Sequence, residues 1–94
     1  MSLYRTQVKI VADVLSAAMD DGSNEGVGIT HLLRRANVSY ARMVRMLNDL
    51  VGSGLLEALE QEKGNRYRTS ERGLQFLTAY GRFQDFAKSF GLRL

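Results

Sequence analysis

The feature that most constrains the fold is a three-residue break, Asn37-Val38-Ser39, between two segments in which apolar residues recur at helical spacing. The segment before the break carries Leu32, Leu33 and Ala36, and the segment after it carries Met43, Met46, Leu47, Leu50 and Val51. Asparagine tolerates turn geometry, and serine is a good helix N-cap. The break therefore predicts two short helices joined by a tight turn, with Thr30 capping the first and Ser39 capping the second.

The hydrophobic period changes after the Gly52-Ser53-Gly54 cluster. Residues 55–60 and 66–69 suit two short strands, and the loop between them contains Lys63-Gly64-Asn65. Gly-Asn favours a turn because both residues tolerate positive φ. By propensity alone, Leu-Glu-Ala-Leu-Glu would suit a helix equally well. The change of period nevertheless favours a β-hairpin.

Segments on either side complete the predicted element order. Apolar residues at helical spacing from Tyr4 to about Met19 predict a first helix, and 27–29 suit a very short strand. Ser70 is the expected N-cap of a last helix that runs to about Phe90, with Gly91 in a left-handed cap. The apolar residues of the first helix are Val8, Val11, Val14, Leu15 and Ala18.

This order is typical of a winged helix-turn-helix followed by a long C-terminal helix, a mainly α fold with a small β-hairpin (α+β). We expect residues 1–69 to form the winged helix-turn-helix DNA-binding domain. Residues 70–94 would form the C-terminal helix for dimerisation, packed on the same single domain.

Composition argues against catalysis and membrane insertion. A chain of 94 residues supports one core, and its apolar runs are too short to span a bilayer. No secretion signal is visible, and the lack of cysteine fits a cytoplasmic protein without a thiolate metal site. His31 is the only histidine, and neither a phosphate loop nor a nucleophile elbow is present. We expect no enzyme activity, metal or cofactor.

Positive charge is concentrated around the predicted turn. Residues 13–25 hold four acids and no base, whereas residues 30–48 hold four arginines and no acid. Such asymmetry favours double-stranded DNA as the partner, although a solvated helix face remains an alternative. Arg34 and Arg35 are predicted to contact backbone phosphates. The predicted groove-reading residues are Ser39, Tyr40, Arg42 and Arg45, although a tyrosine at a helix start is more often part of a core.

A second basic group lies in the predicted hairpin. Lys63, Arg66 and Arg68 could follow a phosphate backbone or enter the minor groove. Glu57, Glu60 and Glu62 on the opposite arm could instead pair with these bases. DNA contact and mutual neutralisation are about equally supported by the sequence.

The last helix carries an apolar seam at coiled-coil spacing. The seam residues are Phe76, Tyr80, Phe83, Ala87 and Phe90, and Phe86 and Ala79 widen it. Leu74 and Leu77 can face the rest of the domain. So small a chain has little domain left to cover the far part of the seam, which favours a homodimer over a helix folded back on its own core.

Short matches across residues 28–77 resemble a known family. They run Ala36-Asn37-Val38-Ser39-Tyr40, Met43, Met46-Leu47, Leu50, Gly54-Leu55-Leu56, Tyr67, Ser70-Glu71-Arg72-Gly73 and Phe76-Leu77. This pattern is similar to small archaeal winged-helix proteins related to the ten-kilodalton coiled-coil chromatin proteins of Sulfolobus. In that family the last group typically has leucine, threonine and lysine where Thr69, Ser70 and Arg72 stand here.

The resemblance implies DNA binding and dimerisation through the C-terminal helix. It suggests a cytoplasmic, nucleoid-associated transcriptional regulator or architectural chromatin protein. The alternative is a winged-helix module that binds a protein partner within a larger assembly. A basic exposed face on the helix that follows the turn favours DNA over that alternative.

Overall fold

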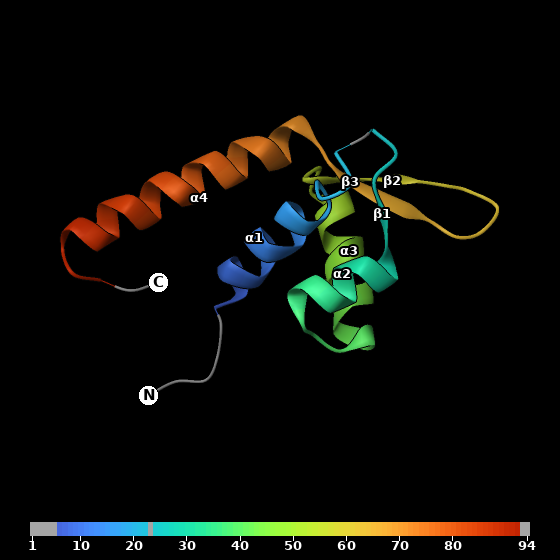
Figure 1. Cartoon of the computed structure of the whole chain (residues 1–94), viewed down its shortest axis with the longest axis horizontal. Coiled ribbons are helices and arrows are strands. Elements are labelled where there is room, and N and C mark those ends of the chain that lie inside the picture. The colour runs from blue at the N-terminus through green and yellow to red at the C-terminus, as the bar shows by residue number, and fades with distance from the viewer. Residues whose placement is uncertain (1–5, 23, 93–94) are drawn as a thin grey trace.

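The computed structural model describes residues 6–22 and 24–92. The elements, in chain order, are α1 (Gln7–Ala17), β1 (Val27–Gly28), α2 (Ile29–Ala36), α3 (Tyr40–Gly52), β2 (Leu56–Leu59), β3 (Arg66–Thr69) and α4 (Glu71–Ser89). The β2–β3 loop and the C-terminal end of α4 lie at opposite ends of the molecule (Figure 1). Its longest dimension is 48 Å.

The turn between α2 and α3 has the predicted chemistry. Asn37 is left-handed, with φ 54° and ψ 53°, a conformation that asparagine tolerates better than most residues. Ser39 then caps α3, and its hydroxyl accepts a hydrogen bond from the Arg42 amide at 3.2 Å. The two short helices are therefore held at the angle of a helix-turn-helix by local interactions.

The start of α2 differs from the prediction. The helix begins at Ile29, which was expected in a strand, and Gly28 occupies the N-cap without a side-chain hydrogen bond. Thr30 therefore lies inside the helix and is not its cap. The chain passes directly from β1 into α2, which leaves no loop residue in which a side-chain cap could be placed.

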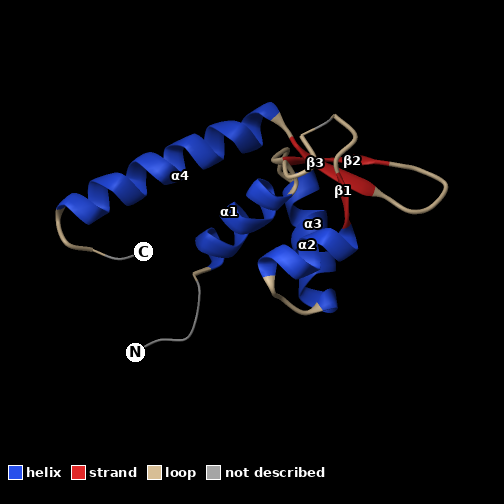
Figure 2. Ribbon diagram, viewed as in Figure 1, coloured by secondary structure: helices blue, strands red, loops and turns tan. Residues whose placement is uncertain are grey.

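The three strands form an antiparallel sheet in the order β1-β3-β2 (Figure 2). Val27 is opposite Tyr67, and Glu57 is opposite Arg68. In the hairpin loop, only Gly64 of the expected Gly-Asn pair takes a positive φ. The expected hairpin is confirmed: β3 has the predicted bounds, and β2 is one residue shorter at each end because Leu55 and Glu60 lie outside it.

The core lies between the three N-terminal helices and the inner face of the sheet. Its largest fully buried side chains are Val14, Leu15, Leu32, Met43, Leu47 and Leu56. Tyr4 lies outside the described residues, and Val8 in the first turn of α1 is about half exposed, whereas Ile10 and Ala12 are buried. Thr69, which stands in place of the family's leucine, donates a 2.6 Å hydrogen bond to the Leu15 carbonyl.

Both ends of α4 are fixed by local caps. The Ser70 hydroxyl accepts from the Gly73 amide at 3.1 Å, and Glu71 lies in the first turn where the helix dipole favours an acid. At the other end the Gly91 amide donates to the Lys88 carbonyl, and the Leu92 amide donates to the Ala87 carbonyl. This is a Schellman ending with Gly91 at φ 76°.

In residues 6–22 and 24–92, no helix combines the length and apolar character that a bilayer crossing requires.

Candidate nucleic-acid interface

Exposed residues surround the α2–α3 turn, and residues 30–48 contain four arginines and no acid. Arg34 at the end of α2 and Ser39, Tyr40 and Arg45 at the start of α3 are all exposed. Tyr40 is 62% exposed, so it does not belong to the core. Within the described part of the chain, neither Arg34 nor Arg45 forms an ion pair. Two guanidinium groups on this surface are therefore available to an anion.

Arg42 lies at one edge of this surface. Its Nη2 donates a 3.0 Å hydrogen bond to Gln7 Oε1 at the first residue of α1. Arg42, Arg45 and Asn48 are all exposed, as expected, but three-residue steps drift around a helix with 3.6 residues per turn. They therefore cross the outward face of α3, with Arg42 on the α1 side and Asn48 on the hairpin side.

Arg35 is held by an acid that follows α1. Its Nε and Nη2 donate to the two carboxylate oxygens of Asp20 at 2.6 and 3.2 Å. His31 Nε2 lies 2.7 Å from the same carboxylate. The hydrogen bond from Arg35 is the main reason that the pKa of Asp20 is lowered. Arg35 thus has an internal partner that phosphate would have to displace.

The two arginines of β3 also point to internal partners. Arg66 donates to the main-chain carbonyls of Glu25 and Gly26, and it lies 3.8 Å from Asp21. Arg68 donates to the carbonyl of Asn24 at 2.8 Å and to the Glu57 carboxylate at 2.9 Å. Together they hold the loop between α1 and β1 against the sheet.

The exposed hairpin loop holds the remaining basic residue of the predicted group, Lys63. Glu60 and Glu62 are exposed in the same loop, so acids outnumber bases there. The pair between Arg68 and Glu57 agrees with the neutralisation alternative for this part of the hairpin. The structure thus leaves Arg34, Arg45 and the start of α3 exposed, and it gives Arg35, Arg66 and Arg68 internal partners.

The predicted seam on α4 is covered in part by its own domain. Ala87 is 2% exposed, Phe76 packs against the core, and Tyr80 is half-buried with its ring stacked on Phe76. The other three aromatic side chains face solvent. Phe83, Phe86 and Phe90 are 57%, 63% and 69% exposed. With the exposed Ala79 they form a solvent-facing stripe along α4.

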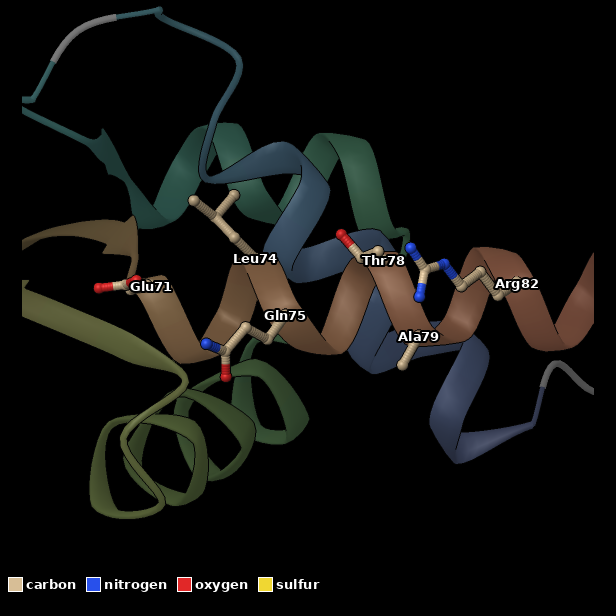
Figure 3. Close-up of a pocket in the computed structure, with 6 residues that line it drawn as sticks. All are labelled: Glu71, Leu74, Gln75, Thr78, Ala79 and Arg82. Carbon is tan, nitrogen blue, oxygen red and sulfur yellow. The ribbon is translucent and has the colours of Figure 1, made fainter.

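A shallow groove of about 360 Å³ runs along another side of α4. It is lined by Glu71, Leu74, Gln75, Thr78, Ala79 and Arg82 (Figure 3). All six residues belong to α4, so the described part of the chain supplies a single wall of this groove. Ala79 borders both the groove and the stripe.

Three contributors to the site escaped the sequence prediction: Gln7, Asp20 and the main chain of residues 24–26. Each contacts a predicted arginine from a segment at least fifteen residues away. No local spacing signals such pairs. The acids of 13–25 and the arginines of 30–48 were visible as charge blocks, and their opposite signs were the available hint that they meet.

Comparison with known proteins bears on the whole chain. A family model described as winged helix-turn-helix matches residues 4–88. Among solved structures, the chain is similar to the crystal structure of Sso10a-2, a DNA-binding protein from Sulfolobus solfataricus. The identity is 22%, the match covers 92% of this chain and 85% of that chain, and the TM-score is 0.76. No curated protein matches the chain. These matches confirm the predicted fold class and support the predicted family.

Proposed function

Because the chain belongs to the winged helix-turn-helix family, we propose that it is a non-enzymatic protein that binds double-stranded DNA as a homodimer. The observation that carries the proposal is the exposed surface around the α2–α3 turn, where neither Arg34 nor Arg45 has an ion-pair partner among the described residues. The similar fold of a protein described as DNA-binding adds support. Regulation of transcription and chromatin architecture are the two roles that this activity would serve on the nucleoid.

In the proposed complex, α3 enters the major groove and its N-terminal half meets the bases. Ser39, Tyr40, Arg42 and Arg45 lie on that part of the helix. Arginine suits both targets, because its fork can bind guanine O6 and N7 or a phosphate group. In this proposal Arg34 contacts a flanking phosphate, and Lys63, which is exposed in the hairpin loop, contacts another. Contacts from Arg35, Arg66 and Arg68 stay a prediction that requires release of their internal partners.

Binding is tested by titrating labelled duplex DNA at several salt concentrations. Phosphate contacts release counterions, so affinity should fall steeply and log-linearly with salt.

Arg42→Ala and Arg45→Ala should each cost about 1–3 kcal/mol of binding free energy if these residues read bases. Arg72→Ala is the matched control, because Arg72 is an exposed arginine in the first turn of α4, outside both the α2–α3 turn and the proposed dimer interface. Absence of binding even at low salt would refute the proposal, and binding to a protein partner instead would favour the alternative function.

The proposed dimer uses the stripe of Ala79, Phe83, Phe86 and Phe90. Three exposed phenylalanines along one side of one helix form an apolar surface that a soluble monomer rarely presents. Phe86 and Phe90 already contact one another, with ring centroids 5.0 Å apart. A second α4 would cover the stripe and supply the missing wall of the neighbouring groove. Phe76, Tyr80 and Ala87 would support this interface from the side that faces their own domain.

Sedimentation measures the dimer directly. Phe83→Glu combined with Phe90→Glu would place two carboxylates in the apolar interface, and the variant should sediment as a monomer. Tyr40→Glu is a suitable control, because Tyr40 is an equally exposed aromatic residue on α3. An unchanged mass for the double variant would show that α4 does not join the subunits.

A further inference from the structure

A hollow of about 330 Å³ separates α3 from the β2–β3 hairpin loop. Tyr40, Val44 and Asn48 line it from α3, where their four-residue spacing places them along one side of the helix. Leu47 and Tyr67 contribute from the buried side, and Asn65 lines it from the hairpin loop. The hollow is therefore apolar and aromatic, with one side-chain amide on the helix and another on the loop.

None of the described residues that line this hollow is charged, yet cations lie on both sides of it. Arg45 is exposed on α3 within one turn of Val44 and Asn48, and Lys63 precedes the lining residue Gly64 in the loop. Phosphate groups would be drawn to those cations. The uncharged hollow would suit a neutral part of the nucleic acid, which is the edge of a base pair.

The chemistry of the lining distinguishes among base pairs. In the major groove, adenine offers N7 and the N6 amino group to a side-chain amide, which can bind both. Thymine offers a methyl group that makes apolar contacts, and it has no counterpart in a G·C pair. Val44 and the exposed ring of Tyr40 provide an apolar surface beside Asn48.

We propose that this hollow reads an A·T base pair, with Asn48 bound to adenine and with Tyr40 and Val44 against the thymine methyl group. The inference rests on the proposed function, because it applies only if α3 lies in the major groove. It adds Val44 and Asn48 to the reading surface as specificity-determining residues. It also gives the protein a preference for A·T pairs in addition to its general attraction to phosphate.

Four duplexes of equal length test the proposal. One is rich in A·T pairs, one has the same sequence with uracil in place of thymine, one has 7-deazaadenine in place of adenine, and one is rich in G·C pairs. Uracil removes only the methyl group, and 7-deazaadenine removes the N7 acceptor. Wild-type protein should bind the A·T duplex about 5- to 150-fold more tightly than the G·C duplex, which corresponds to about 1–3 kcal/mol. Both base analogues should reduce that preference.

Two variants assign the effect to residues. Asn48→Ala should abolish the sensitivity to 7-deazaadenine, and Val44→Ala should reduce the sensitivity to uracil. Arg34→Ala is the control, because loss of a phosphate contact should weaken binding to all four duplexes equally. Equal binding of the wild-type protein to all four duplexes would overturn the inference, as would a full A·T preference in Asn48→Ala. Failure to bind any duplex would overturn the proposed function itself.

Discussion

The arginines beside the α2–α3 turn and those of β3 have the same side chain but opposite surroundings. Arg34 and Arg45 project from helix surfaces without an ion-pair partner among the described residues. Arg66 and Arg68 end on main-chain carbonyls and carboxylates of the loop before β1 and of β2. A guanidinium whose donors are already satisfied stabilises the fold, whereas an unpaired one remains available for a ligand. The surroundings of each guanidinium therefore separate the arginines that stabilise the fold from those that can bind a ligand. The count of arginines in the sequence does not make that distinction.

The largest effect among these predictions is expected in the loop held by β3. In Gly26→Ala, the new Cβ would collide with the main chain of Tyr67, and φ at this position is 73°. Strain and overpacking should together lower the free energy of unfolding by about 3 kcal/mol. Urea denaturation measures the loss.

Gly22→Ala is the matched control for that variant. Gly22 has a similar φ of 66°, but its added Cβ would meet no non-neighbouring atom of the described residues within 4 Å. Its cost should be limited to backbone strain, about 1 kcal/mol. Equal losses in the two variants would show that the close approach of Gly26 to β3 does not matter for stability.

The next largest effect should distinguish the β3 arginines, which stabilise the fold, from the arginines of α2 and α3, which are proposed to bind DNA. Arg66→Ala removes hydrogen bonds to two carbonyls and should lower the free energy of unfolding by about 1–2 kcal/mol. Arg45→Ala should change it by less than about 0.5 kcal/mol, since the side chain is exposed and unpaired. Thermal unfolding and DNA titration of both variants complete the test. If Arg66→Ala were as stable as the wild-type protein but bound DNA more weakly, Arg66 would belong to the DNA interface and not to the group that stabilises the fold.

A smaller effect is expected at Arg34. If it neutralises one phosphate, Arg34→Ala should reduce the magnitude of the salt slope, d log K/d log[salt], by about 1 without changing base preference. Titrations over a salt series give the slope. An unchanged slope would place Arg34 outside the contact surface.

The smallest effect concerns Asp20, because partly exposed ion pairs contribute little. Its pKa is lowered by Arg35, so the folded state binds the Asp20 proton more weakly than the unfolded chain does. The resulting stability is present above the ordinary aspartate pKa of about 3.9, and it is lost as pH falls through the lowered value. The stability advantage of wild type over Asp20→Asn should therefore disappear in acid. A pH-independent difference in denaturation midpoint would contradict this assignment.

Most of the fold could be predicted because its signals are local. Asn37, Ser39, Ser70 and Gly91 each act on the main chain within a few residues, and their roles are confirmed in the structure. Thr30 failed as a cap because the position of a helix start depends on where the preceding strand ends. That strand is set by pairing with β3, which is about 40 residues away in the chain.

The candidate site was less predictable, because several of its contacts join segments that are far apart in the sequence. Exposure and helix spacing located Arg45 and the start of α3, whereas the partners of Arg35, Arg66 and Arg68 come from distant segments. The burial of Ala87 was also hidden, because the apolar spacing of α4 does not distinguish the side that meets its own domain from the side that meets solvent.

The two caps of α4 also determine how long the helix is. Ser70 and Gly91 fix the helix at 19 residues, or about 29 Å at 1.5 Å per residue. In the proposed dimer, this rod sets the distance between two α3 helices, and it is close to the roughly 34 Å that separates successive major-groove faces. An insertion of seven residues, about two turns, would lengthen the rod by about 10 Å and keep the phenylalanines on nearly the same side. In the proposed dimer, the length of α4 would therefore determine which two major-groove faces the α3 helices reach, although α4 itself need not touch DNA.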